Sequence, residues 1–208
     1  LFTLIAFVFF YKSLLNGYVP FPGDLLIGEY APYNSYPFLG YAPSGYPNKG
    51  QDFDVLRLLY PEKEFSMGMF KNLELPFWNP YNFSGNPHIG SLQSGSFYTF
   101  NLIFFLLTFV YGWTVFIILQ TILTAIFTFL FARELRLSVK SSILSALIFA
   151  FSSYLVVWIE YGNIGHSIMW MPFVLLLFLK NLRNPSILKS ILISLSLTFA
   201  ILAGYIQT

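Results

Sequence analysis

Carboxylates are concentrated in one long polar stretch of this chain, residues 16–101. The stretch holds seven of the nine acidic residues: Asp24, Glu29, Asp52, Asp54, Glu62, Glu64 and Glu74. A carboxylate can act as a general base or bind a divalent cation. Asp24 stands out because Pro22 and Gly23 are expected to turn the chain back over the apolar segment that precedes them. The alternative is that Pro-Gly-Asp forms a turn whose carboxylate caps backbone amides.

Other polar residues have both a structural and a functional interpretation. Asp52 and Asp54 precede a helical pattern, and helix capping is the favoured interpretation for both. Glu160 and His166 flank a turn between apolar segments, so they are either solvated loop residues or a functional polar pair. His88 is equally suited to bonding its own loop and to touching a substrate. No His and Asp spacing matches a metal-binding motif, so no metal ligands are assigned.

Aromatic and amide residues gather at the end of the polar stretch, from Trp78 and Asn79 to Gln93. Tryptophan and tyrosine concentrate at membrane–water interfaces, which explains many of the 14 tyrosines without any ligand. Aromatic faces also stack on the apolar faces of sugars, while amides and carboxylates bind hydroxyl groups. The cluster therefore favours a binding surface, although an interfacial belt explains each residue singly.

The composition predicts an integral membrane protein. The 208 residues are 56% hydrophobic and 10% charged, whereas soluble domains carry about a quarter charged residues. A net charge of +2 gives no basic patch for nucleic acid. With no cysteine, a disulfide framework and a zinc–thiolate site are excluded. Because both ends fall at apolar runs, we expect the sequence to be the N-terminal fragment of a longer chain.

The apolar segments predict an all-α polytopic membrane protein with a large first loop. Residues 1–15 read as part of a first span, residues 16–101 as an extramembrane loop, and residues 102–208 as further spans. Within the loop, residues 52–74 read as helical with a break at Pro61, and Phe65, Met69 and Leu73 would form an apolar face lying in the membrane interface. Five or six membrane segments are expected: 1–15, 113–132, 139–158, 168–182 and 186–202, with 97–111 a short span or a re-entrant helix.

Basic residues orient these segments. The turn after residue 132 carries Arg133, Arg136 and Lys140, and the turn after residue 179 carries Lys180, Arg183 and Lys189. Residues 160–167 between them contain no lysine or arginine. The positive-inside rule places both basic turns in the cytoplasm. The long loop, residues 160–166 and the C-terminal residues are then expected on the outer face.

Three sequence blocks resemble the YfhO-type bacterial membrane proteins, a branch of the GT-C glycosyltransferase superfamily. The best block runs from Trp78-Asn79-Pro80-Tyr81 through Ser84-Gly85-Asn86-Pro87 and Gln93-Ser94 to Asn101-Leu102. The others are Gly165-His166 with Trp170-Met171-Pro172, and Gly204-Tyr205-Ile206-Gln207-Thr208. The resemblance covers nearly the whole chain. The family often has histidine at the position of Tyr205, so no role is carried over to it.

The resemblance implies a GT-C-like helical bundle that moves a sugar from a polyprenyl-phosphate carrier to an extracytoplasmic acceptor at the bacterial plasma membrane. Asp24 matches the family's acidic residue in the first outer loop and would be the catalytic base. A divalent cation, Arg57 or Lys71 would balance the charge that develops on the leaving phosphate. Substrate contacts are expected from Glu29, Trp78, Asn79, His88, Gln93, His166 and Gln207. A lipid or solute transporter and a non-catalytic assembly factor are the alternatives.

Overall fold

The computed structural model describes residues 1–208 except 38–39, 41, 44–52, 83 and 208, and for Glu29 it describes the backbone alone. Helices dominate the described residues. The long ones are α6 (Phe109–Glu134), α7 (Val139–Ala150), α10 (Trp170–Arg183) and α11 (Ile187–Leu202). Short helices precede or extend them: α1 (Phe2–Phe9), α2 (Tyr11–Leu15), α5 (Ile103–Leu106), α8 (Ser153–Val157) and α9 (Asn163–Ile168).

Three stretches are long and apolar enough to cross a membrane. They are Phe109–Glu134, Val139–Val157 and Asn163–Arg183, with 26, 19 and 21 residues. The second joins α7 to α8 and the third joins α9 to α10, whereas α11 is apolar but has 16 residues. The expectation of five or six segments is therefore met for three within the described residues. The first predicted segment is divided at Phe10, and residues 97–111 form a 3-10 turn, η4 (Thr99–Leu102), α5 and the start of α6.

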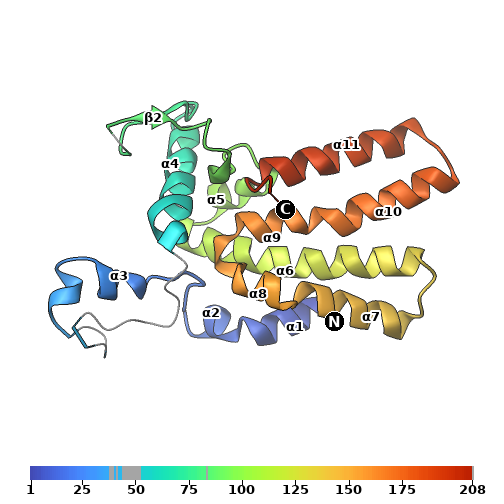
Figure 1. Ribbon diagram of the computed structural model, residues 1–208, viewed down its shortest axis with the longest axis horizontal. Coiled ribbons are helices and arrows are strands. Elements are labelled where there is room, and N and C mark those ends of the chain that lie inside the picture. The colour runs from blue at the N-terminus through green and yellow to red at the C-terminus, as the bar shows by residue number, and fades with distance from the viewer. Residues whose placement is uncertain (38–39, 41, 44–52, 83, 208) are drawn as a thin grey trace.

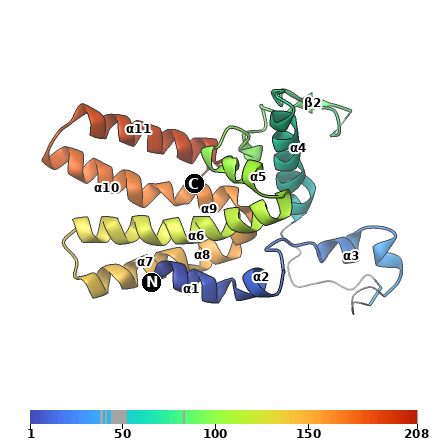
Figure 2. The same ribbon diagram turned by 180° about the vertical axis from the view of Figure 1, so that it is seen from behind.

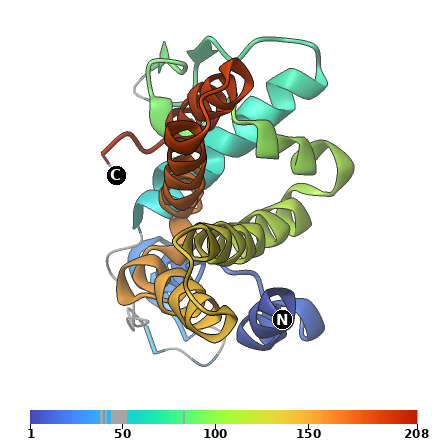
Figure 3. The same ribbon diagram turned by 90° about the vertical axis from the view of Figure 1, so that its right-hand side faces the viewer.

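The long helices run side by side, with α6 in the middle (Figures 1 and 2). α6 packs against both α7 and α10, α10 packs against α11, and α1 lies along α6. The view along the bundle shows α6 between α7 and the α10–α11 pair (Figure 3). The turns from α6 to α7 and from α10 to α11 lie at one end of the bundle, and the polar loop covers the other (Figure 1).

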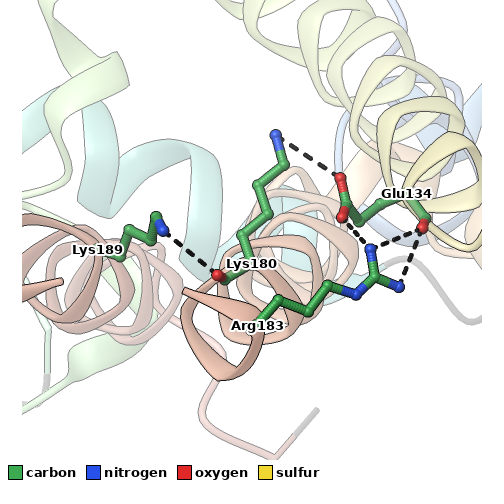
Figure 4. A network of polar contacts seen from close by, with 4 residues as sticks. All are labelled: Glu134, Lys180, Arg183 and Lys189. Carbon is green, nitrogen blue, oxygen red and sulfur yellow. Dashed lines mark hydrogen bonds and ion pairs between the residues drawn. The ribbon is translucent and has the colours of Figure 1, made fainter. Parts of the chain in front are cut away.

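Glutamate 134 joins the two basic turns at the first of these ends. Its carboxylate accepts from the Arg183 guanidinium, and it lies 3.8 Å from the Nζ of Lys180 (Figure 4). Lys189 donates to the backbone carbonyl of Lys180 (Figure 4). The prediction that both basic turns lie on the same side is therefore confirmed. We call this the basic end and the opposite one the loop end.

The polar loop is folded in its described parts. It contains α3 (Leu25–Glu29), a 3-10 turn η1 (Tyr33–Ser35), a π-helical segment η2 (Val55–Leu59), α4 (Tyr60–Lys71), and the antiparallel pair β1 (Trp78–Asn79) and β2 (Asn86–Pro87). A second 3-10 turn, η3 (Leu92–Ser94), precedes η4, and η5 (Ile159–Tyr161) lies between α8 and α9. The predicted break at Pro61 takes the form of the π-helical segment, because proline cannot donate the usual α-helical bond.

The predicted apolar face of the loop helix is wrong at Leu73, because α4 ends at Lys71. α4 buries Glu62, Lys63, Ser66 and Met67, whereas Leu73 lies beyond its end and is 96% exposed. The physical reason is that α4 packs its polar side against hydrogen-bonding partners in the following loop. α4 therefore belongs to the folded cap of the bundle.

The hydrophobic core lies where this loop meets α6. Loop residues Val55, Leu59 and Met67 share one cluster with Trp113 and Phe116 of α6. The indole Nε1 of Trp113 also donates to the carbonyl of Pro20 at 3.0 Å. Burying several large side chains contributes about 2 kcal/mol each, which is enough to hold a loop rich in proline and glycine in a defined position.

Candidate functional site

A polar cavity of about 240 Å³ opens at the loop end of the bundle. Four segments that are far apart in the sequence line it: the start of the π-helical segment, η3, the α8–α9 connection and the C-terminal turn. The lining residues are Asp54, Leu59, Gln93, Trp158, Tyr161, Asn163, Ile164, Tyr205 and Gln207. We call this cavity the outer pocket.

Two glycines allow the C-terminal turn to approach η3. Gly95 has φ +55°, and a Cβ atom there would lie 2.8 Å from the carbonyl oxygen of Ala203. Gly204 has φ +104°, and its Cβ would lie 2.8 Å from the carbonyl oxygen of Gln93. Side chains at either position would push the two segments apart. The glycine pair therefore brings Gln93 and Gln207 to one pocket.

Asp54 is the carboxylate of the outer pocket. It occupies the N-cap position of the π-helical segment, but its side chain makes no capping hydrogen bond and is exposed. The capping interpretation is therefore wrong for Asp54, because its backbone is already helical and the carboxylate does not reach back to the amides. Asp52 lies outside the described residues.

Aromatic rings and amides complete the pocket. The rings of Trp158 and Tyr161 meet edge to face with centroids 4.9 Å apart. The amide of Asn163 is held by its own segment, because its Oδ1 accepts from the Ile164 amide at 2.8 Å. The Asn163 Nδ2 lies 3.5 Å from the Gln93 carbonyl oxygen. One carboxylate, three amides and three aromatic rings suit a ligand with many hydroxyl groups and flat apolar faces.

His166 is buried beside this pocket but does not line it. Its Nε2 lies 2.9 Å from the carbonyl oxygen of Phe116, which can only accept, so Nε2 carries the proton. Its Nδ1 then accepts from the Tyr98 hydroxyl at 3.1 Å, and the Tyr98 oxygen accepts from the Trp170 indole. Both ring nitrogens are occupied, so His166 joins the loop to α6 and α9.

His88 belongs to a second buried network, which joins α4 to residues 88–96. Its Nε2 lies 2.7 Å from the Ser66 hydroxyl, which also contacts the Ser96 hydroxyl at 2.9 Å. Its Nδ1 has no hydrogen-bond partner among the described residues. Burial lowers the pKa of His88. The neutral ring therefore acts as a link between α4 and its loop.

The remaining predicted residues lie elsewhere in the loop. Asn79 is buried in β1, and its Oδ1 accepts from the Tyr81 amide at 2.9 Å. Trp78 covers Gly85, where a Cβ would lie 2.6 Å from the indole ring. Asp24 precedes α3, makes no capping bond and does not line the outer pocket. Glu29 ends α3, which lies on a part of the loop that projects beyond the loop end of the bundle (Figures 1 and 2).

Sequence reasoning missed Lys63, a buried cation at the loop end. Its Nζ donates to the Asn101 Oδ1 at 3.1 Å and lies 5.0 Å from the centre of the Phe116 ring. Burial lowers the pKa of Lys63 to about 7. Lys63 lies four residues before Met67 and therefore on the same face of α4. This spacing indicates burial of Lys63 only when that face is already known to be buried.

Neighbouring Glu62 is also buried. Its Oε2 accepts from the Ser91 hydroxyl at 3.0 Å, and burial raises its pKa.

Among the residues that the structure describes, no three histidine, aspartate or glutamate side chains come together as a metal site. Comparison with known protein families, curated proteins and solved structures found no match to this chain.

Proposed function

We propose that this chain is the membrane-embedded part of a glycosyltransferase whose sugar site is the outer pocket. The observation that carries the proposal is the composition of that pocket, in which Asp54 lies with three amides and three aromatic rings. The sequence predicts that Gln93 and Gln207 contact the substrate, and both residues line the pocket. The donor is a polyprenyl-phosphate sugar, and the acceptor is an extracytoplasmic glycan, lipid or protein.

Placement in a membrane is part of the proposal and has its own support. Three stretches of helix are long and apolar enough to span a bilayer. The basic turns gather at the end opposite the loop end (Figure 1), and the outer pocket lies at the loop end. The positive-inside rule assigns such a basic end to the cytoplasmic face. The pocket would then open at the outer face of the bacterial plasma membrane. A lipid-linked donor can reach such a site from the bilayer.

Asp54 is the base in the proposed reaction. The acceptor hydroxyl oxygen attacks the anomeric carbon of the donor sugar while its proton passes to the Asp54 carboxylate. The bond from that carbon to the phosphate oxygen breaks, and polyprenyl phosphate leaves with the electron pair. The new glycosidic bond forms on the opposite face of the sugar. Asp24, the base expected from the family resemblance, is the alternative that a variant must exclude.

Negative charge on the departing phosphate needs a cation nearby. Arg57 follows Asp54 by three residues in the same helical segment, whereas Lys71 ends α4. The Arg57 Nε donates to the Tyr30 hydroxyl at 2.7 Å, and its guanidinium lies over the Phe53 ring. Its closeness to Asp54 along the same helical segment favours Arg57 over Lys71. A divalent cation held jointly by Asp54 and the donor phosphate would serve the same purpose.

The test uses purified full-length protein with a radiolabelled polyprenyl-phosphate sugar. Asp54→Asn keeps the size of the side chain and removes the base, so transfer should fall by roughly 100-fold or more. Asp24→Asn should leave transfer within about twofold, and Glu64→Asn, an exposed change in α4, is the control for lost charge. Addition of a chelator separates the divalent cation from Arg57. Loss of transfer in Asp24→Asn alone would identify Asp24, which precedes α3, as the base. Wild-type protein that binds the donor without transferring sugar would show that the pocket is a binding site and not a catalytic one.

A further inference from the structure

A second cavity, of about 310 Å³, lies toward the basic end and is lined almost entirely by apolar side chains. It uses the last turns of α6, one face of α7 and the first turns of α10. The lining residues are Thr128, Phe131, Ala132, Leu135, Leu137, Ser145, Phe149, Met171, Pro172 and Leu175. We call it the basic-end cleft. A helix is about 10 Å wide, so this volume is too small to hold a whole helix but suits a hydrocarbon chain.

An unsatisfied hydroxyl marks the wall of the cleft. Thr128 is 9% exposed, and its Oγ1 has no hydrogen-bond partner within the described part of the chain. One turn earlier, the Thr124 hydroxyl donates to the Gln120 carbonyl at 2.6 Å, as threonine usually does in a helix. A buried hydroxyl costs about 1–3 kcal/mol when it is left unpaired. Thr128 is thus available to an oxygen atom of a bound ligand, such as an ester carbonyl.

Two exposed basic residues, Arg136 and Lys140, lie in or next to the turn that borders the cleft. Arg136 lies between the lining residues Leu135 and Leu137, and Lys140 is the second residue of α7. Neither side chain forms an ion pair or a hydrogen bond with any described residue, whereas Glu134 pairs with Lys180 and Arg183 on the neighbouring turn (Figure 4). Arg136 also has φ +64°, a conformation that usually selects glycine.

We propose that the basic-end cleft binds one anionic phospholipid, with an acyl chain along α6 and the phosphate on Arg136 and Lys140. The positive charge of Arg136 and Lys140 and the apolar lining together suit a ligand that is both anionic and hydrophobic. Anionic lipids are attracted to basic residues beside membrane helices. The inference rests on membrane insertion, but not on sugar transfer, so the two proposals can fail separately.

Native mass spectrometry of the purified full-length protein measures this site directly. Phosphatidylglycerol should bind in preference to phosphatidylcholine. Arg136→Gln with Lys140→Gln should weaken phosphatidylglycerol binding by roughly 30-fold, whereas Lys180→Gln with Lys189→Gln removes as much charge from the other turn and should have little effect. Arg136→Gly removes the charge and suits the positive φ of the turn. Weaker phosphatidylglycerol binding in this variant would therefore reflect the lost charge and not misfolding.

A second pair of variants tests the apolar part. Ser145→Phe should fill the cleft and displace the acyl chain, whereas Ile148→Phe, on an exposed position of the same helix, should not. Inorganic phosphate at millimolar concentration should not compete. Equal binding of the two lipids, equal losses in both double variants, or displacement by free phosphate would each overturn the assignment.

Discussion

At the scale of single residues, the burial of Lys63 makes the stability of the fold depend on pH. Its amine is buried against Asn101 and Phe116, and its pKa falls from 10.5 to about 7 on folding. Between these values the unfolded chain holds a proton that the folded chain does not. Stability should therefore rise with pH from about 7 toward 10.5, by roughly 1 kcal/mol per pH unit, and this gain is lost as the pH falls back to about 7.

The variant Lys63→Met tests this sign. It keeps a flexible side chain of similar length and removes the titrating amine, so thermal unfolding between pH 7 and 9.5 should lose most of its pH dependence. Lys71→Met, at the exposed end of the same helix, should retain it. An unchanged slope in Lys63→Met would mean that the amine stays protonated in the folded protein.

At the scale of elements, α9 depends on one close approach to α6. A Cβ atom on Gly165 would lie 2.0 Å from the Oε1 of Gln120, whose Nε2 donates to the Ile159 carbonyl at 2.7 Å. Gly165→Ala should therefore cost about 1–3 kcal/mol of stability, because the helices must separate or Gln120 must abandon its bond.

Gly68→Ala is the matched control for this change. Gly68 also lies in a helix, but a Cβ there meets nothing within 4 Å. Alanine should stabilise α4 by up to about 1 kcal/mol through its higher helix propensity. Chemical denaturation of both variants gives the comparison. Similar losses in both would show that helix propensity, and not the contact with Gln120, governs the effect.

Sequence patterns predict the helices of this chain better than they predict the contacts between them. The apolar runs correctly predicted the three longest stretches of helix, because a helix of 19 to 26 apolar residues has few alternatives. The predicted face of α4 misses its buried side, because Phe65, Met69 and Leu73 suggest an apolar stripe, while Glu62, Lys63 and Ser66 are buried by tertiary hydrogen bonds. Such bonds join residues far apart in the chain, as Lys63 and Asn101 do, and leave no local periodicity.

The candidate site shows the same limit. The sequence predicts Gln93 and Gln207 as substrate contacts, and both line the outer pocket. It predicts Asp54 as a helix cap and gives no signal for the lining residues Trp158, Tyr161 and Asn163. The approach of η3 to the C-terminal turn depends on the conformations of Gly95 and Gly204. Those conformations could not be inferred from spacing. His166 was named as a substrate contact, yet its hydrogen bonds hold the loop to the bundle.

At the scale of the whole molecule, both proposed ligands depend on which end faces the cytoplasm. The sequence contains no cysteine, so single-cysteine variants can be labelled without background. Gln93→Cys lies in the outer pocket and Lys140→Cys lies at the basic end, and both native side chains are exposed. In intact cells a membrane-impermeant maleimide should label position 93. Position 140 should react only after the membrane is permeabilised.

Labelling at both positions in permeabilised cells is the control that each cysteine is accessible. The reverse pattern in intact cells would place the outer pocket in the cytoplasm, where soluble nucleotide sugars are available and a lipid-linked donor is no longer required. It would also move the basic-end cleft to the outer leaflet and contradict the positive-inside rule. The labelling pattern thus decides the donor class before any transfer assay is made, because a pocket can use only the donors that reach its side of the membrane.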